Sequence, residues 1–405
     1  MEAQRLKKYM KKTPEGLKDM LYEECAAKAE IERSITELFT MRGYSRAITP
    51  TIEYYDLFDD DMTGIPQEQM YKLTSMTGRI MALRPDMTIP IARLVSTRLK
   101  DMPAPIRLYY TENIFKVSMN GSGHENEITQ SGIELIGAKG FCADLEVLDM
   151  AVKVFEKCGI TDYTIEMGHA GFFGSLVSGL GVDDEKKESI RKSIESKNYA
   201  ELSRILSGME DSPAAEALKL LPSLYGGAEI LDEAERLCAD NEAAMECLDY
   251  LRELYVKLTD ISNGSSINLD LGMVHRNNYY TGVVFRGYIN GYGNTVISGG
   301  RYDKLMEKFG RDMPATGFAV ENNALISSLI ASKGSRLLPK VGAVIYAERG
   351  YEAKAVILAG SLADEGCINR LCFSGGEEGA VSYAKELSAQ RVYIVAEQVK
   401  TVELR

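Results

Sequence analysis

One stretch, residues 268–306, constrains the fold more than any other part of this 405-residue chain. It reads NLDLGMVHRNNYYTGVVFRGYINGYGNTVISGGRYDKLM, which predicts two β-strands joined by a glycine-rich turn, with Tyr279 and Tyr280 on opposite faces. Gly299 and Gly300 indicate a close approach of this backbone to another backbone or to a ligand. Tyrosine hydroxyls beside bare glycine backbone would suit a small polar ligand, although a hairpin with tyrosines packed in the core fits the same pattern.

Two motifs in this stretch, YYTGVVF at 279–285 and SGGRYD at 298–303, resemble the paired histidine-specific motifs of histidyl-tRNA synthetases and their paralogues. Among these proteins, the chain most resembles the regulatory subunits of ATP phosphoribosyltransferase, which are synthetase-like proteins of histidine biosynthesis. The resemblance covers essentially the whole chain, including LRPDMT at 83–88 and the region 106–137. It implies an α+β fold of the class II aminoacyl-tRNA synthetase type, with an antiparallel sheet flanked by helices.

Composition limits the possible partners and location of the protein. A hydrophobic content of 45% and a charged content of 26% are ordinary for a soluble globular protein. The net charge of −12 provides no overall basic field for nucleic acid, and no apolar run is long enough for a membrane span. We therefore expect neither tRNA nor membrane binding, although a local basic patch would be enough to bind RNA.

The cysteines and histidines give no sign of a metal or cofactor. Seven scattered cysteines without a CxxC pair predict free thiols in a reducing cytoplasm, rather than a disulfide framework or a zinc site. The three histidines have no metal-ligand spacing, and His169 fits a structural role better than a ligand-binding one.

The N-terminal region carries a predicted long helix and a possible dimer motif. Ile31 and Ile35 belong to an apolar series at helical spacing that predicts a helix from about 23 to 42, with Gly43 as its stop. The following strand contains Pro50, which belongs at a strand edge or bulge. This arrangement resembles the dimer-forming motif of class II synthetases and implies a homodimer.

Residues 70–88 predict a strand, a turn, a second strand and then a helix with Thr88 as its N-cap. Asp86 and Thr88 would lie together near that N-terminus and could hold an ammonium group, although capping alone would explain both. In synthetases this stretch usually reads Leu-Arg-Pro-Glu-Gly-Thr, and its Glu and Thr hold the α-amino group of histidine. Asp86-Met87 in place of Glu-Gly is closer to the regulatory subunits.

The region 106–137 predicts two strands around a polar loop, with Gln130 and Glu134 on one face. Buried there, the two side chains could hydrogen-bond an amino group or an imidazole; exposed, they would be an ordinary solvated face. The region resembles motif 2 of the synthetases, and this chain retains the glutamine and the glutamate of that motif. Thr129 replaces the usual histidine before the glutamine.

The positions that would hold ATP lack the arginines of the synthetases. Lys116 and His124 stand where the synthetases have phosphate-binding arginines, and Ser118 stands where they have a glutamate. His275 replaces a catalytic arginine, with Arg276 one residue out of step, and Ala324 replaces the arginine of motif 3. Losing one preorganised donor to a transition state costs roughly 2.7–4 kcal/mol, so several losses should abolish adenylation.

The remaining sequence predicts the domain organisation. Residues 1–330 form the synthetase-like domain, with a helical insertion at about 172–262 that is rich in Glu, Lys, Ala and Leu. Residues 331–340 are a linker containing glycine and proline. Residues 341–405 read as strand–helix–strand–helix–strand–strand, a small α/β domain resembling a shortened anticodon-binding domain.

The resemblance implies a non-catalytic regulatory subunit that pairs with the short form of the ATP phosphoribosyltransferase catalytic subunit in a hetero-oligomer. Histidine would be its feedback effector. The residues that the resemblance assigns to histidine are Asp86, Thr88, Lys116, Gln130, Glu134, His275, Tyr280 and Tyr302. An active histidyl-tRNA synthetase would have to manage without arginine at positions 116, 124, 275 and 324. A tRNA-independent amino-acid ligase meets the same objection, whereas another synthetase-like binding module would not need adenylation.

Overall fold

The computed structural model describes residues 10–58, 65–117, 125–209, 212–262, 266–274 and 279–404. The chain divides into two compact units, Met1–Ser332 and Lys333–Arg405. This division falls within the stretch 331–340 that the sequence predicts as a linker, although its first residues still belong to a helix.

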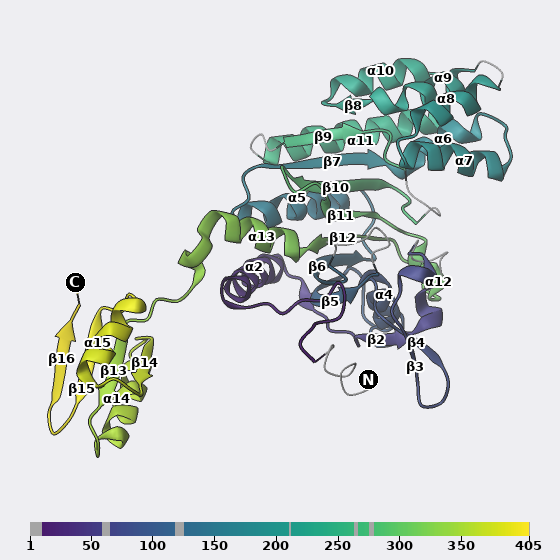
Figure 1. Cartoon of the computed structure of the whole chain (residues 1–405). Coiled ribbons are helices and arrows are strands. Elements are labelled where there is room, and N and C mark those ends of the chain that lie inside the picture. Colours follow the sequence, from purple (N-terminus) through teal and green to yellow (C-terminus); the bar gives the residue numbers. More distant parts are fainter. Residues whose placement is uncertain are drawn as a thin grey trace, which may run out of the picture. The chain divides into compact units, whose positions relative to one another are not determined.

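In the described residues, nine strands of the larger unit form one sheet in the order β1-β5-β6-β12-β11-β10-β7-β9-β8 (Figure 1). They are β1 (Ser45–Arg46), β5 (Ile106–Phe115), β6 (Glu127–Ile136), β7 (Tyr163–His169), β8 (Tyr225–Gly226), β9 (Ser266–Asp270), β10 (Val283–Ile289), β11 (Thr295–Arg301) and β12 (Ala315–Glu321). Neighbouring strands run antiparallel except for β1 with β5 and β7 with β9. The predicted antiparallel sheet of the class II synthetase type is thus confirmed.

Long helices cover one face of this sheet (Figure 1). They are α2 (Tyr22–Met41), α5 (Phe141–Lys157) and α13 (Asn322–Lys333). Helix α2 forms as predicted, because Ile31, Ile35 and Phe39 recur every four residues and are buried. The Phe39 ring contacts the rings of Tyr109 and Phe318, at centroid distances of 5.8 and 6.0 Å, and so fixes the helix on the sheet.

The opposite face carries smaller elements that enclose a second part of the core. They are a three-stranded sheet of β2 (Ile52–Tyr54), β4 (Ile80–Leu83) and β3 (Lys72–Thr74), with helices α4 (Thr88–Thr97) and α12 (Leu305–Lys308). Buried Met87, Ile91, Val95 and Met306 pack between them and the large sheet. The 3-10 turns in the described residues of this unit are η1 (Tyr55–Phe58), η2 (Gln67–Gln69) and η3 (Leu221–Ser223).

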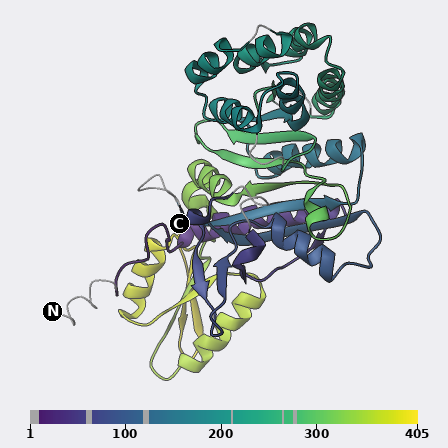
Figure 2. The same cartoon turned by 90° about the vertical axis from the view of Figure 1, so that its right-hand side faces the viewer.

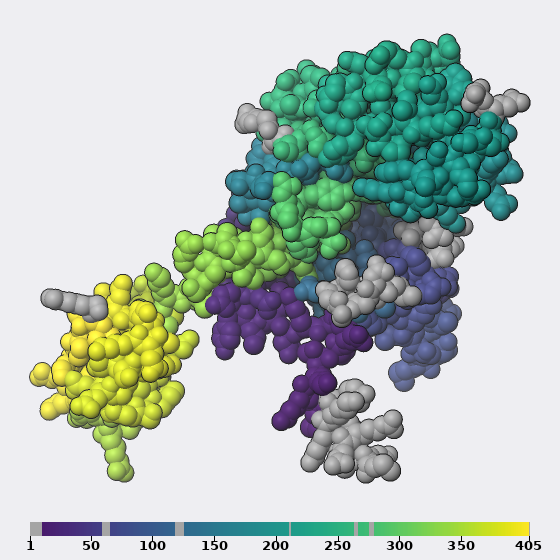
Figure 3. Space-filling view, turned by 45° about the horizontal axis from the view of Figure 1, so that its top comes forward, coloured from purple at the N-terminus to yellow at the C-terminus, as the bar shows by residue number. Residues whose placement is uncertain are grey.

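The helical insertion follows β7 directly and stands at the β7–β9 edge of the sheet, as Figures 1 and 2 show. Its helices are α6 (Ala170–Ser178), α7 (Asp184–Glu195), α8 (Tyr199–Ser207), α9 (Pro213–Leu220), α10 (Glu229–Cys238) and α11 (Glu242–Ile261). Five of these six helices have a side chain that accepts a backbone N–H as N-cap, and these side chains are His169, Asp183, Asn198, Ser212 and Asn241. In the space-filling view the insertion forms a continuous teal surface (Figure 3).

The smaller unit has its own sheet, in the order β14-β13-β15-β16, and its own hydrophobic core. After the turn η5 (Gly334–Leu337) come β13 (Ala343–Ala347), α14 (Glu352–Asp364), β14 (Asn369–Cys372), α15 (Gly376–Glu386), β15 (Arg391–Val395) and β16 (Val399–Glu403). This is the predicted order of strands and helices. Across the described parts of both units, no helix combines the length and apolarity needed to cross a membrane.

Candidate functional site

Seven of the eight residues assigned to histidine line one cavity of about 280 Å³ on the α4 side of the large sheet. They are Asp86, Thr88, Lys116, Gln130, Glu134, Tyr280 and Tyr302. The eighth, His275, lies outside the described residues, as do Ser118, His124 and Arg276. The volume is just below the range of about 300–1,000 Å³ typical of small-molecule sites, so the cavity suits a ligand the size of an amino acid.

Glu134 is the buried carboxyl group of the cavity. It lies on β6 beside Gly317 of β12, where a Cβ atom would come within 2.3 Å of Glu134 Oε2, so only glycine leaves room for the carboxylate. The Tyr302 hydroxyl donates a hydrogen bond to Glu134. Burial raises the pKa of Glu134 to about 8, although hydrogen bonds with Tyr302 and Thr88 oppose the shift. Glu134 can therefore gain or lose a proton near neutral pH.

Asp86 and Lys116 place opposite charges in the same cavity. Burial raises the pKa of Asp86, and the Lys116 charge and nearby backbone N–H groups act in the opposite direction. Asp86 Oδ1 accepts the Ile89 N–H at 3.1 Å and so satisfies the start of α4. The prediction of Thr88 as N-cap is wrong: Thr88 is the first helical residue, and its side chain bonds Glu134 instead.

Gln130 contributes an unsatisfied acceptor. Its side chain is 4% exposed, and within the described part of the chain its Oε1 atom has no hydrogen-bond partner. Leaving a buried acceptor unpaired costs roughly 1–3 kcal/mol, which a ligand that donates a hydrogen bond would recover. A charged amino group is such a donor.

Three tyrosines form an aromatic wall of the cavity. The Tyr279 ring stacks on Tyr302, with centroids 5.6 Å apart and planes at 19°, and meets Tyr280 edge-on at 4.9 Å. Burial raises the pKa of all three hydroxyls, so they stay neutral donors. The predicted strand alternation fails here, because β10 begins only at Val283 and both Tyr279 and Tyr280 line the cavity.

The glycine prediction is confirmed. A Cβ atom on Gly299 would lie 2.5 Å from the Gly317 carbonyl oxygen, and one on Gly300 would lie 2.8 Å from the Tyr280 ring. Both glycines thus permit close backbone packing beside the tyrosines. Sequence reasoning missed Tyr279 and Gly317 as cavity residues, and also Glu195, which reaches the cavity from α7 of the insertion.

The cavity lacks the arginines that adenylation would use, as far as the structure describes its lining. Lys116 is the one positively charged side chain among the described lining residues. Ala324 is fully buried in α13 and offers no charge. Because Lys is a point charge without the planar fork of a guanidinium, Lys116 is a poor substitute for a bidentate phosphate clamp.

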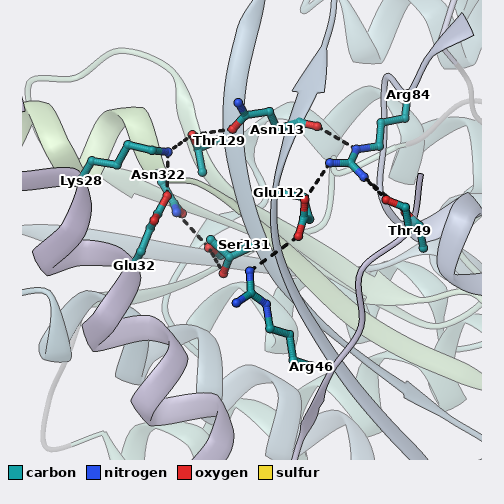
Figure 4. A network of polar contacts seen from close by, with 11 residues as sticks. Lys28, Glu32, Arg46, Thr49, Arg84, Glu112, Asn113, Thr129, Ser131 and Asn322 are labelled. Carbon is teal, nitrogen blue, oxygen red and sulfur yellow. Dashed lines mark hydrogen bonds and ion pairs between the residues drawn. The ribbon is translucent and has the colours of Figure 1, made fainter. Parts of the chain in front are cut away.

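A polar network holds the β5–β6 hairpin that supplies Gln130 and Glu134 (Figure 4). The buried Arg84 guanidinium pairs with Glu112 at 3.0 Å and donates to the carbonyl oxygens of Asn113 and Thr49 at 2.8 and 2.7 Å. This arginine comes from the LRPDMT motif, and it supports the site rather than lining it.

On the opposite face of the hairpin, Lys28 of α2 donates to Thr129, and Thr129 donates to Asn113 at 2.9 Å (Figure 4). Asn322 at the start of α13 donates to Ser131 at 2.9 Å. Thr129, where the synthetases have histidine, is therefore a scaffold residue on the face away from the cavity.

His169 is structural, as the sequence favours. It is the N-cap of α6, where its Nδ1 atom accepts the Gly171 N–H at 3.1 Å. Burial lowers the pKa of His169 to about 4, which keeps the imidazole neutral and able to accept that bond.

Comparison with known proteins identifies the family. The sequence model of the histidyl-tRNA synthetase family matches residues 16–325. The ATP phosphoribosyltransferase regulatory subunit of Clostridium kluyveri is 40% identical over 379 residues, which are 93% of this chain and 97% of that protein. The regulatory subunit of Bacillus mycoides is 37% identical over 362 residues, which are 89% and 86% of the two chains.

Solved structures agree with the sequence relatives. A protein from Bacillus halodurans C described as an ATP phosphoribosyltransferase regulatory subunit/histidyl-tRNA synthetase superposes with a TM-score of 0.85 at 30% identity, over 96% of this chain and 99% of that chain. The histidyl-tRNA synthetase of Nostoc shares the fold, with a TM-score of 0.77 at 19% identity over 97% of each chain. The chain therefore belongs to the family of ATP phosphoribosyltransferase regulatory subunits, which have the fold of histidyl-tRNA synthetases.

Proposed function

We propose that this protein is the non-catalytic subunit of a hetero-oligomeric ATP phosphoribosyltransferase and that it senses histidine in the cavity described above. Its partner is the short-form catalytic subunit, which joins ATP to phosphoribosyl pyrophosphate in the first step of histidine biosynthesis. Family membership supports the partnership. The observation that carries the sensing role is the gathering of seven residues, which the family resemblance assigns to histidine, around a single amino-acid-sized cavity.

The polar groups of the cavity match the functional groups of histidine. Glu134 and the Tyr302 hydroxyl suit the imidazole, which can both donate and accept hydrogen bonds. Asp86 and the unsatisfied Gln130 oxygen suit the α-ammonium group, which has three donors. Lys116 provides the positive charge that the α-carboxylate requires.

Sensing requires binding without turnover. A histidine held in this cavity would meet one lysine and, among the described residues, no guanidinium with which to stabilise pyrophosphate departure. Its binding energy is then available to favour one quaternary state over another, because a ligand shifts an equilibrium only through its differential affinity for the two states. Feedback inhibition follows if histidine prefers the less active state.

Assembly and location follow from the same proposal. The subunit forms a homodimer, as class II synthetase-like proteins do, and this dimer joins the catalytic subunits. All seven cysteines are free thiols, and three of them are buried, which suits the reducing cytoplasm.

Two assays on the purified protein test the proposal. Mixed with a short-form catalytic subunit, the protein should raise phosphoribosyltransferase activity above that of the catalytic subunit alone. Histidine-dependent ATP–pyrophosphate exchange by the protein alone should stay at background. Robust exchange would instead identify an active synthetase. If the protein had no effect on the catalytic subunit, it would be a synthetase-like binding module with another function.

A further inference from the structure

A buried ion pair stands directly behind the tyrosine wall of the cavity. Arg301 is the last residue of β11 and precedes Tyr302. Its guanidinium pairs with Asp144 through two contacts, Nη2 to Oδ1 at 2.7 Å and Nε to Oδ2 at 3.0 Å. Both residues are at least nine-tenths buried. The Nε contact is a hydrogen bond and the Nη2 contact is an ion pair, so both carboxylate oxygens of Asp144 face the guanidinium.

Arg301 orders both segments that carry the cavity tyrosines. Its carbonyl oxygen accepts the Thr281 N–H at 2.7 Å, and its side-chain carbons pack against Gly282, where a Cβ atom would lie 3.1 Å from Arg301 Cδ. Asp303 pairs with Arg301 Nη1 at 3.1 Å and donates its own N–H to Thr281 Oγ1 at 3.0 Å. The position of Arg301 therefore constrains the backbone on both sides of the wall.

The ion pair is also anchored to the helical insertion. Asp144 lies in the first turn of α5, and its Oδ2 atom accepts the Tyr250 hydroxyl at 2.5 Å. Tyr250 belongs to α11 of the insertion, and neither residue lines the cavity. One chain of contacts thus runs from α11 through Asp144 and Arg301 to the segment that contains Tyr302.

We propose that Asp144 and Tyr250 are positioning residues for histidine: α11 holds Asp144, Asp144 orients Arg301, and Arg301 sets the Tyr302 hydroxyl against Glu134. This inference rests on the proposed function, because it takes histidine as the ligand of the cavity. It makes the insertion a determinant of ligand affinity through residues that never touch the ligand.

Loss of the Asp144–Tyr250 contact should change the pH dependence of histidine binding, which a purely stabilising role would leave unchanged. The Tyr302 hydroxyl favours the ionised form of Glu134, so displacing it raises the pKa of Glu134. The pH profile of histidine binding should then move to higher pH. Among the described residues, the other titratable groups that line the cavity are unchanged in the variants below; they are Asp86, Lys116, Glu195, Tyr279 and Tyr280. Tyr110, which interacts electrostatically with Glu134, is unchanged as well.

The test is calorimetric titration of the full-length protein with L-histidine at several pH values. Tyr250→Phe removes one hydroxyl, and Asp144→Asn removes the charge that faces Arg301. The matched control is Tyr225→Phe, because the Tyr225 hydroxyl also links the insertion to a sheet carboxylate, Glu166, at 3.0 Å but lies away from the cavity.

We expect Tyr250→Phe and Asp144→Asn to weaken histidine binding at least about fivefold, the low end of typical coupling between sites, and to shift the profile to higher pH. Tyr225→Phe should bind as the wild type does. Since Asp144→Asn leaves a buried guanidinium without its counter-charge and can unfold the protein, the decision rests on Tyr250→Phe. The inference alone would be overturned if Tyr250→Phe kept the wild-type affinity and pH profile, or if Tyr225→Phe lost as much affinity as Tyr250→Phe. If the wild-type protein did not bind histidine, the proposed function would be overturned as well.

Discussion

Glu134 is a buried carboxyl group that suits a ligand but destabilises the protein without one. Its pKa of about 8 lies above the ordinary value of 4.5 for glutamate because burial penalises the charged form. The folded protein therefore binds more protons than the unfolded chain between these two values. The contribution of Glu134 to the free energy of unfolding therefore falls as pH rises through that window. The full destabilisation by the buried carboxylate is reached above about pH 8.

Histidine affinity should depend on pH through Glu134. The N–H donor of the imidazole favours the carboxylate form of Glu134, so binding releases a proton and strengthens as pH rises toward about 8. Glu134→Gln should abolish this part of the dependence and raise the thermal stability of the unliganded protein at alkaline pH. Calorimetric titrations of the wild type and Glu134→Gln with histidine at several pH values check this. The protonation of free histidine affects both proteins equally, so the difference between their pH profiles reports Glu134. Parallel pH profiles in the two proteins would refute this role.

Gly317→Ala should damage the site sterically, because the added Cβ would lie 2.3 Å from Glu134 Oε2 and equally close to the Ile133 carbonyl oxygen. We expect a loss of about 1–3 kcal/mol in the free energy of unfolding from overpacking, together with much weaker histidine binding. Gly360→Ala in α14 is the control, since nothing lies within 4 Å of its Cβ position and alanine favours a helix interior. Chemical denaturation of both variants checks the difference.

Individual site residues could be predicted where chemistry and a local motif coincide. Asp86, Gln130 and Glu134 sit in segments whose strand or helix-start pattern already shows which side chains can meet. Tyr279 and Tyr280 are predicted to lie on opposite faces but line the same cavity, because the strand that contains the alternation begins only at Val283. Glu195 could not be found, since no local pattern tells where the insertion meets the sheet.

At the level of the elements, the β5–β6 hairpin is the support on which the cavity depends. Its two strands pair over ten residues, and the fully buried Arg84 ties them to β4 and to the segment around Thr49 (Figure 4). Strands and helices here were predictable because their apolar spacing matches their burial. The role of Arg84 was not, because a buried arginine is recognisable only once its acceptors surround it.

Arg84→Met should be severely destabilising. It removes the buried partner of an ion pair with the part-buried Glu112 and leaves the carbonyl oxygens of Asn113 and Thr49 without their donor, a change that we expect to cost about 3 kcal/mol. The comparison is Arg33→Met in α2, whose i,i+4 pair with Glu37 is 60% exposed on both side chains and should cost less than about 0.5 kcal/mol. Urea denaturation of the two variants gives both values, and similar midpoints would contradict the structural role of Arg84.

For the whole molecule, ligand binding and the C-terminal unit should be separable. Every described cavity residue belongs to Met1–Ser332, and Lys333–Arg405 has a core of its own. A chain ending at Ser332 should therefore fold and bind histidine with wild-type affinity. Circular dichroism and calorimetry check this, and a folded truncated protein that no longer binds would show that the smaller unit contributes to the site.

The most direct test of the account measures feedback inhibition in the assembled enzyme. The wild-type subunit and Glu134→Ala are each combined with a short-form catalytic subunit, and phosphoribosyltransferase activity is followed against histidine concentration, with assembly checked by gel filtration. We expect both complexes to form and turn over, and the Glu134→Ala complex to need at least about tenfold more histidine for half inhibition, equivalent to about 1.4 kcal/mol. Equal inhibition of the two assembled complexes would contradict the assignment of this cavity to histidine.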